Sequence, residues 1–187
     1  MAQNFKKKIC LLTDMLNGGG AERSAGLLSI VFTELCYDVV LITMIDDISY
    51  PFSGKLINLG KFKNGSRSIL NKFYRYRELY KLMRQDKFDI VLDFRMKNFP
   101  IREFFLNCFV FNTKMVNMIR SYNLKWYLPD PSILSRYLYQ DYSGINTVSF
   151  EIKSEIEKRY NFINVNTIHN IIDINFVKEK AKENLET

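Results

Sequence analysis

Cysteine and histidine, which most often hold structural zinc or cross-link small domains, are scarce in this sequence. Its 187 residues include three cysteines (Cys10, Cys36 and Cys108) and one histidine (His169). The cysteines form no C-x-x-C pair and their number is odd, so a zinc site and a disulfide framework are both excluded. We expect three reduced and mostly buried thiols.

Long apolar runs are also missing, since none reaches the roughly 18 residues that a membrane-spanning helix needs. The basic start of the chain resembles that of a signal peptide. The apolar stretch that follows covers only residues 9–12, however, and Asp14 interrupts it. We therefore expect the protein to stay in the cytoplasm.

What remains is the composition of an ordinary soluble domain. Hydrophobic residues make up 47% of the chain and charged residues 25%, which excludes a wholly disordered or collagen-like chain. A chain of this length can bury one sizeable core.

Apolar, β-branched runs alternate along the chain with stretches whose apolar residues recur every three or four positions. The first pattern is typical of strands buried on both faces of a parallel sheet, and the second of helices that cover it. The alternation predicts one doubly wound, Rossmann-like α/β domain with helices on both faces. Ligands of such sheets bind beyond the carboxyl ends of the strands. The expected strands are 8–13, 38–44, 55–59, 88–93, 114–119, 145–148 and 165–168, and the expected helices are 21–36, 66–86, 99–111, 127–142, 149–160 and 175–186.

Positive charge is concentrated in one segment. The net charge of the chain is +7, and residues 61–87, which are also rich in aromatic side chains, carry an excess of seven positive charges. Composition leaves three interpretations open: a solvated helix whose aromatic residues pack inward, a surface for an anionic membrane, or a surface for nucleic acid. On the first interpretation, the inward face consists of Ile69, Phe73, Tyr76, Tyr80 and Met83.

Three of the chain's eight glycines, Gly18, Gly19 and Gly20, lie together between the first expected strand and the first expected helix. Small residues let a phosphate or a sugar approach the backbone, and the helix N-terminus offers free N–H groups and partial positive charge. A dinucleotide fingerprint is excluded because its third glycine position falls on Arg23, and the Gly-Lys-Ser/Thr of a P-loop is absent. The loop is either a ligand-binding turn of another kind or a tight turn without a ligand.

Segments in the right order over most of the chain resemble the N-terminal domain of family 4 glycosyltransferases, which have the two-domain GT-B fold. KICLLTDML, GGGAER, SAGLLSIVFTEL and DVVLITM resemble the family's opening strand, glycine loop, amphipathic helix and second strand. FDIVLDF, MVNMIRS, NTVSFEIKSEIEKRY and TIHNIIDI resemble later segments, the last of which precedes the second domain.

The resemblance implies an enzyme that transfers a sugar from a UDP- or GDP-linked donor to a glycan or lipid-linked acceptor, with retention of configuration and without a metal or other cofactor. In the family, the N-terminal domain mainly shapes the acceptor site. A C-terminal domain with a Glu-x7-Glu motif holds most of the nucleotide-sugar.

No such motif follows TIHNIID in this sequence. We therefore expect residues 1–173 to form the acceptor-binding half of the enzyme, and residues 174–187 a helical linker toward a missing C-terminal domain. The alternative is a non-catalytic binding subunit of a split glycosyltransferase. A nucleic-acid partner is disfavoured because no recognition motif supports it.

The resemblance also assigns residues to the site. Gly18, Gly19 and Gly20 would face the donor diphosphate or the transferred sugar. Arg120 lies at the carboxyl end of an expected buried strand, where open α/β sheets bind ligands and where the family often has His. It would be catalytic, stabilising the leaving phosphate or holding an anionic acceptor, unless it forms a structural ion pair. The further candidates for donor or acceptor binding are Glu22, Arg23, Arg95, Ser121, Ser149, Glu151, Asn170 and Asp173.

Several of these candidates have structural alternatives. Arg23 either reaches the cleft or pairs with a surface carboxylate, and Glu22 suits a helix N-terminus electrostatically. Ser149 is a natural N-cap. Asn170 and Asp173 readily fix a turn through their own backbone, and His169 is expected in a turn or at the surface.

Many enzymes with this resemblance act on lipid-linked acceptors at the cytoplasmic face of a membrane. This favours the membrane interpretation of residues 61–87. Arg67, Lys72 and Arg75 are predicted to face the anionic membrane surface, with the protein peripheral on the inner face of the cell membrane.

Overall fold

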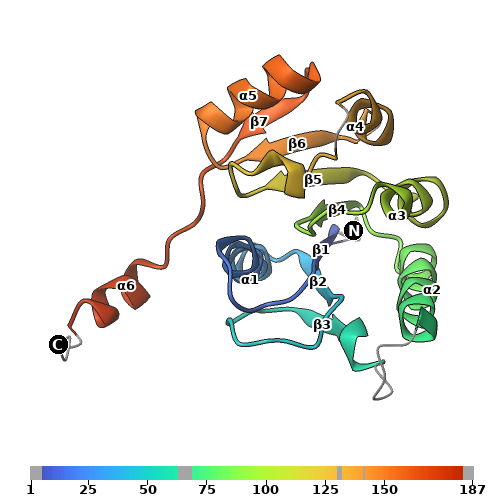
Figure 1. Ribbon diagram of the computed structural model, residues 1–187. Helices are drawn as coiled ribbons and strands as arrows, with labels where there is room; N and C mark the ends of the chain where they lie inside the picture. Colours follow the sequence, from blue (N-terminus) through green and yellow to red (C-terminus); the bar gives the residue numbers. More distant parts are fainter. Residues whose placement is uncertain (1–5, 63–68, 130–131, 141, 183–187) are drawn as a thin grey trace, which may run out of the picture.

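In the computed structural model, which describes residues 6–62, 69–129, 132–140 and 142–182, seven strands form one sheet (Figure 1). The strands are β1 (Lys8–Thr13), β2 (Asp38–Thr43), β3 (Lys55–Asn58), β4 (Ile90–Asp93), β5 (Met115–Ile119), β6 (Gly144–Thr147) and β7 (Val165–Thr167). Their order in the sheet is β3-β2-β1-β4-β5-β6-β7, and all neighbouring pairs are parallel. The predicted doubly wound α/β domain is thereby confirmed.

The direction of winding reverses at β1. The chain builds outward from β1 through β2 and β3, and then crosses to β4 on the other side of β1. β1 is buried because it is apolar on both faces, and Cys10, Leu11 and Leu12 have no exposed surface. Open α/β sheets bind ligands beyond the carboxyl ends of the strands at such a reversal.

The described ranges contain six helices and three shorter helical turns. The helices are α1 (Gly20–Glu34), α2 (Ile69–Gln85), α3 (Pro100–Phe105), α4 (Ser132–Tyr139), α5 (Phe150–Tyr160) and α6 (Ile174–Lys180), with the 3-10 turns η1 (Leu59–Lys61) and η3 (Leu124–Trp126) and the π-helical turn η2 (Leu106–Val110). α2, η2, α4 and α5 contribute to the core on one face of the sheet, and α1 covers the other face (Figure 1). No helix in these ranges combines the length and apolarity needed to cross a bilayer.

Two expected helices differ in form from the prediction. The range 99–111 is helical, but it changes from α3 to the wider π-helical winding at Leu106. In the range 127–142, α4 covers Ser132–Tyr139, and residues 130, 131 and 141 lie outside the described ranges. Proline lacks the N–H that a helix interior needs, so Pro129 precedes the helix rather than lying within it.

The inward face of α2 differs from the prediction. Leu79 and Met83 are buried, with 0% and 2% of their surface exposed, whereas Phe73 and Tyr80 are 65% and 44% exposed. Tyr76 packs partly against the core, and the side chain of Ile69 lies outside the described residues. The prediction was wrong for Phe73 and Tyr80 because two neighbouring stripes of this helix both repeat at helical spacing.

The cysteines also depart from expectation. Cys10 is buried in β1, but Cys36 and Cys108 are exposed, so the prediction of mostly buried thiols was wrong for these two. Cys36 follows α1 in a left-handed conformation with φ 66°, and Cys108 lies in η2. Neither position faces the sheet, which is where a small apolar side chain would be covered.

α6 stands apart from the sheet. Figure 1 shows the chain leaving β7 as an extended segment that leads to this helix. Ile174 and Val177 of α6 are 62% and 49% exposed. The assignment of residues 174–187 to a linker stays a prediction, and residues 183–187 lie outside the described ranges.

The orientation of α2 can be tested by truncating one side chain on each stripe. Leu79→Ala removes a fully buried side chain and should lower the free energy of unfolding by about 2–5 kcal/mol. Phe73→Ala should change it by only about 0.5 kcal/mol, as at most surface positions. Urea unfolding followed by circular dichroism measures both. Equal losses in the two variants would contradict the observed face.

Candidate functional site

The candidate site lies at the carboxyl edge of the sheet, where β1, β4, β5 and β6 end. The glycine loop follows β1, Arg120 follows β5, and Ser149 follows β6. Because all strands are parallel, these segments emerge at the same edge. The predicted site residues therefore come from loops that the fold brings to one side of the molecule.

One position of the glycine loop requires glycine. Gly18 has φ +83°, a left-handed conformation that side chains disfavour. A Cβ on Gly19 would meet only the end of the flexible Glu22 side chain, which can move aside. Gly19 is the N-cap of α1, and no side chain caps the helix. The Glu22 carboxyl lies in the first turn of α1, beside Gly19, and accepts a hydrogen bond from the Glu22 N–H, while the loop before the helix has no bulky side chain.

Glu22 lies under this loop rather than in the cleft, with 7% of its surface exposed. Burial raises the pKa of the Glu22 carboxyl, and the nearby negative charge of Asp14 raises it further. Burial likewise raises the pKa of Asp14, whose carboxylate accepts a hydrogen bond from the Met96 N–H at 2.8 Å. Sequence analysis did not identify Asp14 as a site residue, although a polar side chain directly after a buried strand is the signal that could have found it.

Arg120 is half-buried at the end of β5. Its Nη1 donates a hydrogen bond to the Ile168 carbonyl at 3.1 Å, and its guanidinium lies 5.6 Å from the centre of the Phe94 ring. Burial lowers the pKa of Arg120 to about 10, so the side chain stays protonated at neutral pH. In the described part of the chain its Nε makes no hydrogen bond. The guanidinium thus retains a donor in a partly buried setting.

Ser121 and Tyr127 complete this corner. The Ser121 hydroxyl accepts a hydrogen bond from the Asn123 N–H at 3.2 Å, so it supports a turn. Tyr127 is 2% exposed; burial, followed by the negative charge of Glu22, raises its pKa to about 12. Sequence analysis did not single out Tyr127, because an aromatic residue in a loop has no distinctive pattern.

Four predicted residues meet between α1 and the segment after β7. Gly20, Arg23, Asn170 and Asp173 line one cavity of about 210 Å³. A neighbouring cavity of about 340 Å³ includes Arg120 in its wall. The two cavities share Ser24 and Ile171 in their walls, so Gly20 and Arg120 line neighbouring cavities.

Arg95 is not at the cleft. It is 1% exposed, and its guanidinium binds both carboxylate oxygens of Asp93 at 2.9 Å and Glu103 at 3.2 Å. Lys97, also fully buried, lies 3.3 Å from the same Asp93 carboxylate and donates to Asn117 at 2.9 Å. Burial by itself raises the pKa of Asp93, but Arg95 and Lys97 lower it below its usual value. The donors of Arg95 are directed into the protein, which does not fit its predicted role in binding a ligand.

Ser149 and Glu151 form the start of α5. The Ser149 hydroxyl accepts a hydrogen bond from the Ile152 N–H at 3.4 Å, as an N-cap does. A hydrogen bond with Ser149 lowers the pKa of the exposed Glu151. His169 is exposed, with its Nδ1 2.7 Å from the Val148 carbonyl. Ser149 therefore acts as an N-cap, which was the structural alternative predicted for it. His169 lies at the surface.

Of the three residues predicted to face a membrane, two lie in the described ranges, and these two differ in their exposure. Lys72 is exposed on α2. Arg75 is half-buried and donates to the Met44 carbonyl at 2.9 Å, so its guanidinium points toward the end of β2. Arg67 lies outside the described residues. Arg77, 52% exposed, projects from α2 in the way that was predicted for Arg75.

Several solved structures share this fold, and three of them are described here. A glycosyltransferase from Rickettsia africae ESF-5 matches 97% of this chain and 47% of its own, with a TM-score of 0.56 at 12% identity. The lipopolysaccharide outer core galactosyltransferase WaaB, in its apo form, matches 89% of this chain and 46% of its own, with a TM-score of 0.51 at 13% identity. HepE (Alr3699) from Anabaena, in complex with UDP-glucose, matches 90% of this chain and 45% of its own, with a TM-score of 0.54 at 12% identity.

These likenesses establish the fold of the chain as that of one half of a GT-B glycosyltransferase structure. The chain spans about half the length of the structures that it matches. No family model matches the sequence, and no curated protein matches it. In the described residues no group of three or more His, Cys, Asp or Glu side chains is arranged to hold a metal ion.

The structural role of Arg95 predicts a large effect on stability. Arg95→Met leaves Asp93 and Glu103 buried without their main partner, and breaking a buried ion pair costs about 3–5 kcal/mol. Arg77→Met, which removes an exposed pair with Glu78, should cost less than about 1 kcal/mol. Chemical unfolding of both variants measures the difference. If Arg95→Met proved as stable as Arg77→Met, the buried network would have no structural importance.

Proposed function

We propose that this chain is the acceptor-side half of a retaining, metal-independent family 4 glycosyltransferase, which transfers a sugar from a UDP- or GDP-linked donor to a glycan or lipid-linked acceptor. One observation carries the proposal. The N-terminus of α1, behind a loop in which Gly18 has a left-handed backbone, lines a cavity next to the one that the half-buried Arg120 lines.

The chemistry of this region suits a diphosphate. The N-terminus of α1 supplies N–H groups and partial positive charge, and Arg120 supplies a full positive charge that burial does not neutralise at pH 7. Sugar transfer from a nucleotide-sugar releases a nucleoside diphosphate, so negative charge develops on the leaving oxygen. A fixed cation and helix dipole aimed at that charge lower the barrier.

Further support comes from the matched structures. HepE was solved in complex with UDP-glucose, and we extend a nucleotide-sugar donor to this chain as part of the proposal. On this reading Gly18–Gly20 approach the donor, while Arg23, Asn170 and Asp173 shape the cleft between α1 and the segment before α6.

The second candidate function is a non-catalytic binding subunit of a split glycosyltransferase. It is favoured by the coverage of the matches, because the chain corresponds to 45–47% of each matched structure. The two candidates differ in whether one polypeptide contains both halves. Reading the coding sequence beyond residue 187 decides which protein must be assayed.

Arg120 provides the test of the enzymatic proposal. In the complete protein, transfer from UDP- and GDP-linked sugars to lipid and glycan extracts should be detectable, and Arg120→Ala should lower kcat/KM about 10²–10³-fold, as removal of one charge-stabilising donor does. Radiolabel transfer or product mass spectrometry provides the measurement.

Lys158→Ala, at an exposed position on α5, is the matched control and should leave kcat/KM unchanged. Transfer that is equally fast in Arg120→Ala would remove Arg120 from the mechanism. Donor binding without transfer to any acceptor would favour the binding subunit instead.

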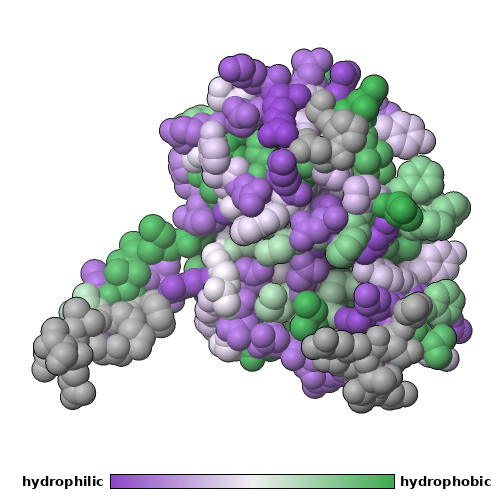
Figure 2. All heavy atoms as spheres, in the orientation of Figure 1, coloured by the Kyte–Doolittle hydropathy of each residue, from purple (hydrophilic) through white to green (hydrophobic). Residues whose placement is uncertain are grey.

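We also propose that the protein is cytoplasmic and rests on an anionic membrane through a basic-aromatic edge. We define this edge by Lys72, Phe73, Arg77 and Tyr80 of α2 with Phe105 and Phe109 of α3–η2. The four aromatic residues are 44–65% exposed, and Figure 2 shows hydrophobic side chains gathered over α2 and α3. Exposed aromatic and basic side chains together are typical of surfaces that enter the membrane interface.

The membrane proposal predicts salt-sensitive binding to anionic liposomes. Each basic residue near such a surface contributes about 1 kcal/mol, so Lys72→Glu with Arg77→Glu should weaken binding by about 30-fold or more. Co-sedimentation measures the bound fraction, and Lys158→Glu controls for overall charge. Binding that is absent, or insensitive to both salt and the double substitution, would refute the proposed orientation.

A further inference from the structure

An open groove lies between α2 and the helical segment α3–η2, on the outer surface of the molecule. α2 and η2 pack against each other, and Figure 1 shows α2 beside α3. The groove has a volume of about 520 Å³, within the usual range of about 300–1,000 Å³ for small-molecule sites. The part of α2 that lines it, residues 73–80, spans about 10 Å along the helix. The groove shares no residue with the two cavities near the glycine loop and Arg120.

The wall of this groove is apolar and aromatic. We define the α2–η2 groove by Phe73, Tyr76 and Tyr80 of α2 and by Phe105, Leu106 and Phe109 of α3–η2. Leu106 is 2% exposed, whereas Phe105 and Phe109 are 57% and 56% exposed, with their ring centres 5.7 Å apart. Single exposed rings are common on protein surfaces, but several that gather around one groove mark a site for an apolar partner.

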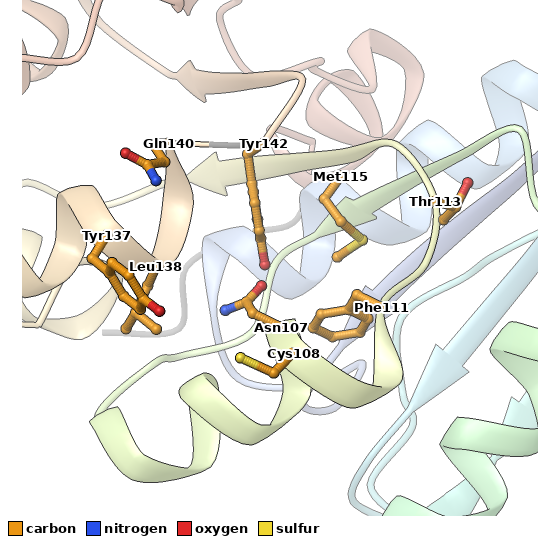
Figure 3. Close-up of a pocket in the computed structure, with 9 residues that line it drawn as sticks. All are labelled: Asn107, Cys108, Phe111, Thr113, Met115, Tyr137, Leu138, Gln140 and Tyr142. Carbon is orange, nitrogen blue, oxygen red and sulfur yellow. The ribbon is translucent and has the colours of Figure 1, made fainter.

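Only one side of α3–η2 has this character. Figure 3 shows Asn107 of η2 directed toward Tyr142, in a pocket that has polar side chains and shares no residue with the groove. Phe104 is stacked on Tyr137, with ring centres 6.4 Å apart and planes at 14°. Its neighbour Phe105 lines the groove instead. Adjacent residues of one short helix therefore belong to two different surfaces.

Arginine side chains lie at both ends of the groove. Arg102, in the first turn of α3, lines the end near the carboxyl edge, and its Nη2 donates to the Met96 carbonyl at 2.7 Å. Arg84, in the last turn of α2, donates to the Phe109 carbonyl of η2 at 3.4 Å. Arg84 thereby bridges the two helical segments near the amino edge.

Arg77 is the cation of the groove that a ligand can reach. Arg102 is paired with the buried Glu103 at 2.7 Å. Arg77 is 52% exposed and approaches Glu78 only at 3.6 Å, on the surface, where such pairs are weak. α2 as a whole has five basic residues and one acidic residue. The groove therefore combines an apolar wall with a positively charged rim.

We propose that the α2–η2 groove binds one acyl chain of an anionic phospholipid, with the lipid phosphate beside Arg77. Such a lipid supplies an apolar chain and a negative charge in one molecule, which matches the wall and the rim. Most residues of the basic-aromatic edge also line the groove, so it opens toward the membrane in the orientation proposed above, on which this inference rests. The inference adds a site for a single lipid to adsorption on a charged surface.

The length of the acyl chain provides the first test, with the lipid supplied as a monomer. Hexanoyl and octanoyl lysophosphatidylglycerol are titrated into the complete protein below their micellar concentrations, and isothermal titration calorimetry measures Kd. Each buried CH₂ strengthens binding about fourfold, so the octanoyl lipid should bind about 15-fold more tightly than the hexanoyl lipid. The ratio should persist at high salt, because burial of a chain is not screened, whereas adsorption to anionic liposomes weakens.

Phe105 and Phe104 provide matched variants, since they are neighbouring exposed rings of α3 and only Phe105 lines the groove. Phe105→Ala should weaken binding of the octanoyl lipid about tenfold, the loss expected for about 50 Å² of apolar contact. Phe104→Ala should leave binding unchanged. Circular dichroism checks that both variants are folded.

Arg77→Gln tests the position of the phosphate. It should weaken binding of octanoyl lysophosphatidylglycerol about fivefold, as expected for one basic residue near an anionic lipid. Binding of monooctanoylglycerol, which has the same chain and no phosphate, should not change.

Three results would overturn the proposal. The first is that neither lysolipid binds as a monomer although anionic liposomes still sediment the protein, which leaves the membrane edge standing without a lipid site. The second is that Phe104→Ala and Phe105→Ala weaken binding equally. The third is a dimer in sedimentation velocity that Phe105→Ala dissociates and the octanoyl lipid does not, which makes a second copy of the chain the occupant.

The opposite combination separates this inference from the membrane proposal. Monomeric lipid that binds with the expected chain-length ratio and the expected loss in Phe105→Ala supports the groove, even where liposomes do not sediment the protein. In that case only the proposed orientation on the membrane fails.

Discussion

The buried carboxylate of Asp93, at the end of the central strand β4, is the group on which the carboxyl edge of this sheet depends. It binds Arg95 in two places and Lys97 in a third, and these two cations in turn bind Glu103 of α3 and Asn117 of β5. A charge without surface must be paired, so every member of this network constrains the next. The loop after β4 is therefore held rigidly beneath the region that Arg120 and the glycine loop border.

The two edges of the sheet differ in their chemistry. The carboxyl edge combines a helix N-terminus, a protonated Arg120 and two carboxyl groups whose pKa burial raises. The amino edge has amides, hydroxyls and aromatic rings without a charge in its described lining.

The strands and the glycine loop were predictable because their signals are local. Apolar runs such as 38–44 and 88–93 are buried on both faces, so they need no knowledge of their neighbours. The face of α2 was not predictable, since Phe73 and Tyr80 repeat at the same helical spacing as Leu79 and Met83. The sequence put Arg95 at the cleft for a related reason, since a residue after a strand can point either toward the cleft or back beneath it. In the structure Arg95 points beneath the cleft, where it binds the carboxylates of Asp93 and Glu103.

The amino-acid sequence by itself determined the α/β class of this protein, the places of its strands, and the glycine loop between the first strand and the first helix, because those properties follow from short runs of residue types. The tertiary structure alone decided which charges are buried and which sites exist. Arg95 became part of the core, Arg75 turned to the Met44 carbonyl, and Tyr142 met Asn107 at an edge far from the glycine loop. These outcomes depend on contacts between distant segments, and such contacts exist only once the sheet has brought those segments together.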